Sequence, residues 1–150
     1  MKSFAFRDLK VWERAIEFAD YAISLSENLE SDRKHYRLVE QFEAASTSIS
    51  MNIAEGKGRN SKKEFIHFLY IARGSLYETI TLAVLFEKRN WISKTELEKI
   101  ESDGIEITSM IKGLINSIRN SMNIFGLKVD EVEMVTNSAS PFVDVYLEQY

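Results

Sequence analysis

The chain has no cysteine, one proline and only two histidines, His35 and His67, among its 150 residues. Without cysteine there is no disulfide framework, no thiol nucleophile and no thiolate metal site, and two histidines leave little room for imidazole chemistry. Uninterrupted apolar runs, such as residues 82–86, are far shorter than a bilayer span, and the first residues lack the apolar stretch of a signal peptide. We therefore expect a cytoplasmic protein that does not enter a membrane.

Size and composition are those of one soluble domain, which excludes a two-domain enzyme. Hydrophobic residues make up 45% and charged residues 28% of the sequence, the balance of a globular chain. Residues 121–150 hold Lys128 against five acidic side chains, whereas residues 1–120 carry equal numbers of basic and acidic groups. Because a neutral body lacks the basic charge of a general nucleic-acid binder, any such role must rest on a local patch.

Hydrophobic periodicity predicts four amphipathic helices. Their expected ranges are about residues 9–28, 34–55, 62–88 and 93–118. The third and fourth begin with capping-box sequences, in which a serine and a glutamate three residues later satisfy free amide groups: Ser61 with Glu64, and Ser93 with Glu96. We predict an all-α fold, an antiparallel up-and-down four-helix bundle over residues 1–120, with a C-terminal extension over residues 121–150.

The third predicted helix is apolar over too much of its circumference for a simple monomeric bundle. Its apolar residues spread over roughly 260° of the helical wheel, where a surface helix needs a stripe only a little over 100° wide. The apolar surface left over after one bundle core is filled is most simply covered by another subunit, although the C-terminal segment could also lie over it. The residues expected at an interface between subunits are Trp12, Phe18, Phe68, Ile71 and Leu82.

Three stretches of sequence carry a resemblance to a known family. They are Phe6–Ala15 (FRDLKVWERA), Ser48–Gly56 (SISMNIAEG) with Arg59, Ser61 and Glu64-Phe65 after it, and Phe68–Glu78 (FLYIARGSLYE). Over about residues 4 to 120 the chain resembles the bacterial four-helix bundle proteins encoded by intervening sequences of 23S ribosomal RNA genes. These proteins are related to the accessory variability determinant of diversity-generating retroelements.

This resemblance implies a small four-helix bundle that assembles as a homopentamer. In the retroelement branch the protein is basic and binds a reverse transcriptase and nucleic acid, so the resemblance makes RNA or DNA and a reverse transcriptase candidate partners. For the ribosomal branch the biochemical role is essentially unassigned. The neutral helical body and the segment after Asn120 depart from the family pattern.

A basic turn over residues 56–63 separates the second and third predicted helices. It contains four cations, Lys57, Arg59, Lys62 and Lys63. Its glycines can expose backbone amides, and the positive N-terminal end of the next helix adds to the field, so a phosphate would be attracted. No strand precedes the turn and its spacing is not that of a P-loop. The alternative is that a glycine here only ends one helix while Ser61 only caps the next.

Arg73 falls inside the apolar arc of the third helix, where an unpaired charge would be costly. Glu55, on a polar flank that also carries Asn52, is the first candidate partner, and Glu78 is the second. No nucleophile and base accompany these residues, so we interpret them as a structural polar network and expect no catalytic site.

Two Glu/Asp-x-x-His spacings raise the question of a two-iron bundle centre. They are Asp32 with His35 and Glu64 with His67. The first pair lies at a helix start, Glu64 belongs to a capping box, and His67 points away from the apolar face. We therefore expect neither a metal nor another cofactor.

The extension over residues 121–150 is acidic and ends in the apolar, aromatic sequence PFVDVYLEQY. A solvated tail rarely carries so many apolar side chains, so we interpret it as a docking segment, which could rest on its own bundle, on a neighbouring copy or on a partner. The sequence as a whole favours a non-enzymatic oligomeric adaptor that brings together nucleic acid and a protein partner. The alternative is a purely protein–protein interaction or structural assembly with no nucleic-acid binding.

Overall fold

The computed structural model describes residues 2–29 and 35–124, and all regular structure in these residues is helical. A short 3-10 helix, η1, is followed by four α-helices. Their bounds are Ala5–Asp8 (η1), Lys10–Glu27 (α1), Tyr36–Lys57 (α2), Lys62–Lys88 (α3) and Lys94–Ile124 (α4). Each α-helix starts within a few residues of its predicted start. Helix α4 ends six residues later than predicted. From residue 125 on, the predicted docking segment lies outside the described residues.

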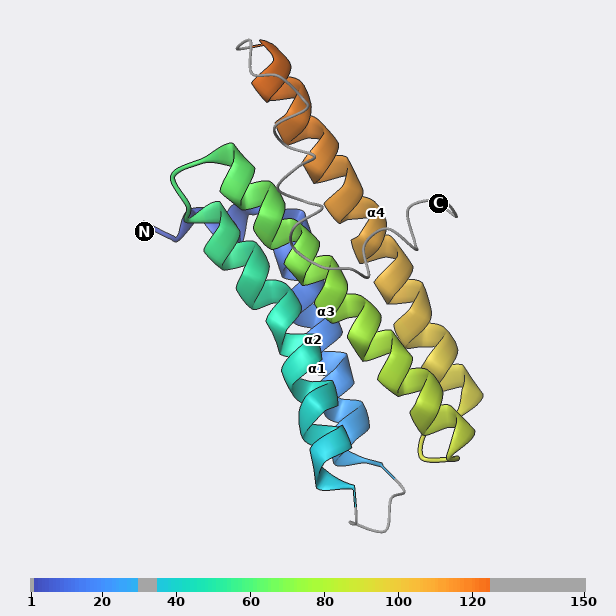
Figure 1. Cartoon of the computed structure of the whole chain (residues 1–150). Helices are drawn as coiled ribbons and strands as arrows, with labels where there is room; N and C mark the ends of the chain where they lie inside the picture. Colours follow the sequence, from blue (N-terminus) through green and yellow to red (C-terminus); the bar gives the residue numbers. More distant parts are fainter. Residues whose placement is uncertain (1, 30–34, 125–150) are drawn as a thin grey trace.

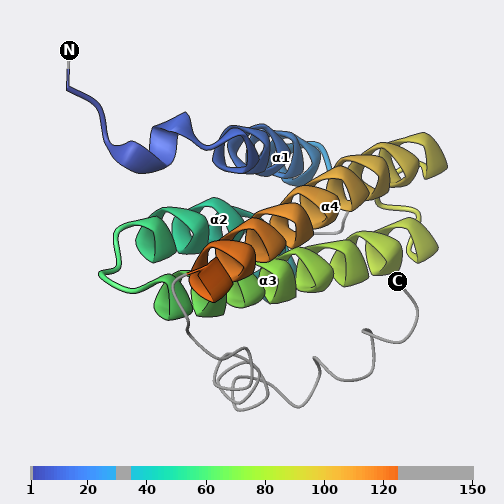
Figure 2. The same ribbon diagram turned by 90° about the horizontal axis from the view of Figure 1, so that it is seen from above.

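The four helices form an antiparallel up-and-down bundle. Each helix packs on the next one along the chain, and α1 also packs on α4. Figure 2, seen from above, shows α4 running obliquely, from the level of α1 at its start to the level of α3 at its C-terminal end. The C-terminal part of α4 projects beyond the N-terminal end of α3 in Figure 1. The predicted fold class is confirmed.

Both predicted capping serines accept a hydrogen bond from the glutamate amide three residues later, and the reciprocal bond of a full capping box forms at Ser93 and Glu96. The Ser61 hydroxyl accepts a hydrogen bond from the Glu64 amide at 3.1 Å. At the start of α4 the Glu96 amide donates to the Ser93 hydroxyl at 3.1 Å, and the Glu96 carboxylate accepts from the Ser93 amide at 2.7 Å. Because these bonds satisfy amides that have no partner inside the helix, they fix where α3 and α4 begin.

The turn from α3 to α4 is a Schellman motif closed by an aromatic contact. Asn90 has a positive φ of 59°, a conformation that asparagine tolerates better than most residues. The Trp91 amide donates to the Phe86 carbonyl and the Asn90 amide to the Glu87 carbonyl, both at 2.8 Å. The rings of Phe86 and Trp91 lie 5.4 Å apart, so the turn is fastened to the core.

The core runs the length of the bundle and takes residues from every α-helix. Phe42 of α2 and Phe86 of α3 are fully buried, with ring centroids 5.1 Å apart. Phe18 and Leu82 are also buried inside the single chain. Their predicted place at a subunit interface is therefore wrong, because the bundle's own core already covers them.

Small residues bring α2 and α3 close together. Ser46 and Ser50 are buried, and the Ser75 hydroxyl donates to the Ser48 hydroxyl at 3.0 Å between the two helices. By length and hydropathy alone α3 could cross a membrane, but core helices of soluble proteins share these properties, and here α3 packs between α2 and α4.

Candidate functional site

The basic turn lies at one end of the bundle, where α2 ends and α3 begins (Figure 1). Gly58 is the C-cap of α2, and its amide donates to the Glu55 carbonyl at 3.1 Å. Ser61 is the N-cap of α3. Both capping roles are thus real, and they also place the cations of the turn around the positive N-terminal end of α3.

The four predicted cations are brought together but have different surroundings. Lys57, Arg59 and Lys62 are exposed, and Lys63 is half-buried. Arg59 forms an ion pair with Glu55, one turn earlier. The Lys62 ammonium donates to the Ser121 hydroxyl of α4 at 2.9 Å. This bond brings the end of α4 to the same end of the molecule as the turn.

Two aromatic rings of α3 lie beneath the turn. The Arg59 guanidinium carbon is 4.8 Å from the centre of the Phe68 ring, and the Lys57 ammonium is 5.9 Å from that of Phe65. Both distances are within the range of cation–π attraction. Phe65 is buried and Phe68 half-buried. Lys57 and Arg59 therefore pack against aromatic rings of α3, which restricts where their charged groups lie.

An aromatic cluster at the N-terminus was not predicted from the sequence. Phe4 stacks on Phe6 with ring centroids 5.5 Å apart, and Phe6 lies 5.2 Å from Trp12. Helix η1, which carries Phe6, packs on α2 as well as on α1, and Figures 1 and 2 both place η1 at the same end as the basic turn. Phe4 is 73% exposed. The signal that could have found the cluster is three aromatics within nine residues.

The predicted polar network around Arg73 does not form. Within the described residues Arg73 has no carboxylate partner, and its guanidinium carbon lies 4.7 Å from the Tyr70 ring centre and 5.8 Å from that of Tyr77. Glu55 pairs with Arg59 instead. The helical wheel suggested that the Arg73 charge is buried, but the side chain is only half-buried. Contact with two neighbouring rings and with solvent is therefore enough to stabilise the charge without a carboxylate partner.

The other two members of that network also bond elsewhere. Glu78 accepts a hydrogen bond from Gln41 of α2 at 2.9 Å. The Asn52 side-chain amide donates to the carbonyl and hydroxyl of Ser48, at 2.8 and 2.9 Å. These bonds link or stiffen α2 and α3, but the four residues are not one network.

Of the predicted interface residues, three are accessible to different degrees. Ile71 is 36% exposed, whereas Trp12 and Phe68 are half-buried. Leu85, 14 residues after Ile71 and therefore about four turns along nearly the same face, is 39% exposed. Part of the surplus apolar surface of α3 thus lies outside the chain's own core.

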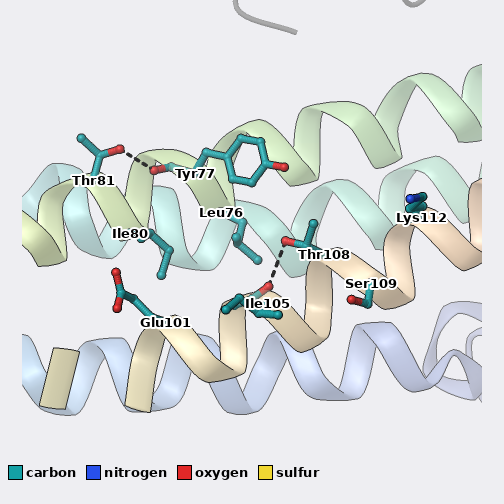
Figure 3. A pocket seen from close by; sticks show the side chains of 10 residues that line it. Leu76, Tyr77, Ile80, Thr81, Glu101, Ile105, Thr108, Ser109 and Lys112 are labelled. Carbon is teal, nitrogen blue, oxygen red and sulfur yellow. Dashed lines mark hydrogen bonds between the residues drawn. The ribbon is translucent and has the colours of Figure 1, made fainter. Parts of the chain in front are cut away.

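A groove between α3 and α4 was also not predicted. It encloses about 610 Å³ and is lined by apolar residues of both helices, among them Leu76, Ile80 and Ile105 (Figure 3). Gly104 lies in its lining and lets Ile80 pack close to α4, because a β carbon there would lie 3.2 Å from the Ile80 Cδ1 atom. Gly104 falls on the apolar seam of α4, and a glycine at such a position is the sequence signal for a close approach of two helices.

Metal-binding side chains do not cluster in the part of the chain that the structure describes. No group of three or more histidine, cysteine, aspartate or glutamate residues there could hold a metal ion. Glu64 is engaged in the capping box with Ser61, and Asp32 lies outside the described residues. The expectation of a protein without a metal stays a prediction.

The helices of the bundle match a known protein family and a solved structure. The family described as 23S rRNA-intervening sequence protein matches residues 7–113. Among solved structures, the chain is similar to a protein of unknown function from the S23 ribosomal protein family of Bacteroides thetaiotaomicron. The two are 28% identical with a TM-score of 0.65, over 70% of this chain and 97% of that chain. No curated protein matches the chain in sequence. The matched residues include α1, α2, α3 and much of α4.

Proposed function

The chain belongs to the 23S rRNA-intervening sequence protein family, and from this premise we propose that it is a non-enzymatic oligomeric adaptor that binds nucleic acid through its basic turn. Family membership confirms the resemblance carried by the three sequence motifs. The relation to retroelement accessory proteins, the homopentamer, and a protein partner such as a reverse transcriptase are part of this proposal.

The observation that carries the nucleic-acid role is the convergence of Lys57, Arg59 and Lys62 at one exposed end of the bundle. The first amides of α3 and the positive end of its dipole lie among these cations, which is an arrangement that attracts phosphate. Phe68 supports Arg59 from below. Because a phosphate would compete with Glu55 for Arg59, a single turn would bind nucleic acid only weakly.

Repetition in an assembly would compensate for that weakness. A ring of subunits presents the same turn several times, and simultaneous contacts raise the overall affinity without any new interaction. The exposed Ile71 and Leu85 of α3 support such self-association, since apolar surface of this kind is most simply covered by another copy. Light scattering tests this step: a pentamer has five times the 17.3 kDa mass of one chain.

The proposal excludes catalysis because the side chains that carry chemistry are few and scattered. The chain has no cysteine and two histidines. His67 lies beside the Phe68 ring, 5.9 Å between centroids, and His35 beside Trp91, at 5.0 Å. Neither position pairs the imidazole with a nucleophile among the described residues, which supports a binding role over an enzymatic one.

The test compares two variants with equal charge change at opposite ends of the bundle. In the first, all four turn cations, Lys57, Arg59, Lys62 and Lys63, become glutamine. In the matched control, four exposed cations near the other end become glutamine: Arg37, Lys88, Arg89 and Lys94. Binding of single- and double-stranded RNA and DNA is measured over a salt series, with light scattering to check that assembly is intact.

We expect the turn variant to lose nearly all affinity and the control to keep most of it. The slope of log affinity against log salt should flatten by about 0.7 to 0.9 for each phosphate contact removed. Equal losses in both variants would mean that only net charge matters. If the intact protein retains no RNA or DNA even at low salt, nucleic-acid binding is wrong and the assembly serves protein–protein interaction alone.

A further inference from the structure

The groove between α3 and α4 leaves an isoleucine in solvent. Ile105 is 69% exposed, while the main apolar seam of α4, which includes Ile100, Ile107 and Ile111, is fully buried. Ile105 lies off that seam and faces the same groove as Leu76 and Ile80 of α3. Exposed apolar surface that lines a groove is typical of a place where another segment docks.

The two threonines that line the groove use their hydroxyl hydrogens on their own helices. The Thr108 hydroxyl donates to the Gly104 carbonyl at 2.9 Å, and the Thr81 hydroxyl donates to the Tyr77 carbonyl at 2.7 Å (Figure 3). The part of the groove between Ile80 and Ile105 therefore favours apolar side chains as its occupant.

One end of the groove is basic. Lys112 lines it there, and Arg73 lies one turn before Tyr77, against that ring. Beyond it, Arg119 donates to the Tyr70 hydroxyl at 3.1 Å, and its Nε atom is buried without a hydrogen-bond partner among the described residues. Neither arginine has a carboxylate partner in the described part of the chain. The opposite end carries the acidic Glu101, so an occupant with carboxylates fits the groove in one direction.

The last residues of the chain have the matching chemistry. Residues 141–150 read PFVDVYLEQY, in which apolar side chains alternate with Asp144 and Glu148. The whole segment from residue 121 has one lysine against five acidic side chains. It therefore combines apolar side chains that match the apolar lining of the groove with negative charge that complements Lys112, Arg73 and Arg119.

The connection is long enough for this segment to return to the groove. Helix α4 ends at Ile124, and Lys112 lies twelve residues earlier, about 18 Å back along the helix. Residues 125–141 can span on the order of 50 Å when extended. Because the segment is tethered to the same molecule, its effective concentration at the groove is in the millimolar range, roughly that of a short flexible linker.

We propose that residues 141–150 of the same chain dock in the groove between α3 and α4. Their apolar side chains cover the exposed Ile105 and the half-buried Ile80, and their carboxylates pair with the cations at the Lys112 end. In this arrangement the segment covers the groove of its own chain. This role is independent of nucleic-acid binding by the basic turn.

The absence of cysteine makes the test direct, because every disulfide must come from introduced residues. In the full chain, Ile105→Cys is combined with Val145→Cys. The matched control combines Val145→Cys with Met51→Cys on α2, since Met51 is 66% exposed and does not line the groove. Disulfide formation is followed on non-reducing gels and by mass spectrometry, and circular dichroism checks that both variants are folded.

We expect the groove pair to form a disulfide within one chain at least ten times faster than the control pair. Equal rates would overturn the proposal, and so would a disulfide that forms mainly between two chains, because the groove would then take its occupant from another copy. Adding Asp144→Asn and Glu148→Gln to the groove pair should slow the reaction severalfold, and by less at high salt. No change would overturn the electrostatic part of the proposal.

Discussion

Gly56 and Phe68 are in contact so closely that no other residue fits at the glycine without movement. A β carbon on Gly56 would lie 2.6 Å from the Phe68 β carbon and 2.9 Å from Cδ2 of Phe65. This contact lets the end of α2 meet the start of α3, and Phe68 in turn supports Arg59 at 4.8 Å. Both the close approach of α2 and α3 and the geometry of the basic turn thus depend on Gly56 having no side chain.

Replacing Gly56 by alanine should destabilise the protein by about 1 to 3 kcal/mol, because a β carbon must push α3 away from α2. Gly74→Ala is the control. It is an exposed site in α3 with nothing within 4 Å of a β carbon, and alanine there should stabilise by about 0.5 to 1 kcal/mol through its helix propensity. Urea unfolding of both variants measures the difference, and similar effects would contradict the proposed contact.

Asn90 should be replaceable by glycine but not by alanine. Its φ of 59° costs an alanine on the order of 1 kcal/mol, whereas glycine adopts it freely. We expect Asn90→Ala to lower the melting temperature by a few degrees and Asn90→Gly to leave it nearly unchanged or slightly higher. Equal losses in calorimetry would mean that the asparagine side chain, and not its backbone conformation, matters at this turn.

Stability should fall at alkaline pH in a way that depends on Tyr21. Burial first, and then the nearby Glu96 and Asp103, raise the pKa of the Tyr21 hydroxyl above its usual value, with Lys99 acting in the opposite direction. A raised pKa means that folding favours the neutral phenol. This stabilisation is complete below about pH 10, the pKa of an unfolded tyrosine, and is lost as the pH rises through the higher folded value.

The Tyr21→Phe variant checks this dependence because it removes the titrating group and keeps the ring over which the Lys99 ammonium lies at 4.3 Å. Its free energy of unfolding should decline less steeply between about pH 9 and 11 than that of the parent protein. Identical pH profiles would show that other groups govern the alkaline decline.

Ile71→Glu should separate assembly from folding. Ile71 is 36% exposed in the single chain, so a charge there should leave the bundle folded while it disrupts contacts between copies. Light scattering should then give a mass near 17.3 kDa, with an unchanged helical spectrum. Met51→Glu places the same charge on α2 and should keep the assembly. An unfolded Ile71 variant, or a parent protein that is already monomeric, would contradict self-association through α3.

At the candidate site, residue types and their spacing predict some positions correctly and others not. Ser61 and Glu64 carry their own capping chemistry, so the start of α3 and the position of the basic turn could be predicted from four adjacent residues. Arg73 could not be placed in the same way, because a helical wheel gives a direction but not the neighbours found there. The wheel put it among apolar positions, and the structure puts it against the rings of Tyr70 and Tyr77.

By itself the sequence determined the fold class and, to within a few residues, where each helix starts, because hydrophobic period and capping sequences act over a few neighbouring residues. Tertiary structure alone decided that Phe18 and Leu82 belong to the chain's own core, that Glu55 pairs with Arg59, and that Gly104 lies against Ile80. Each of these depends on how a helix is rotated about its axis and how deeply its neighbour packs. That rotation is set by the combined fit of four helices, which no local spacing contains.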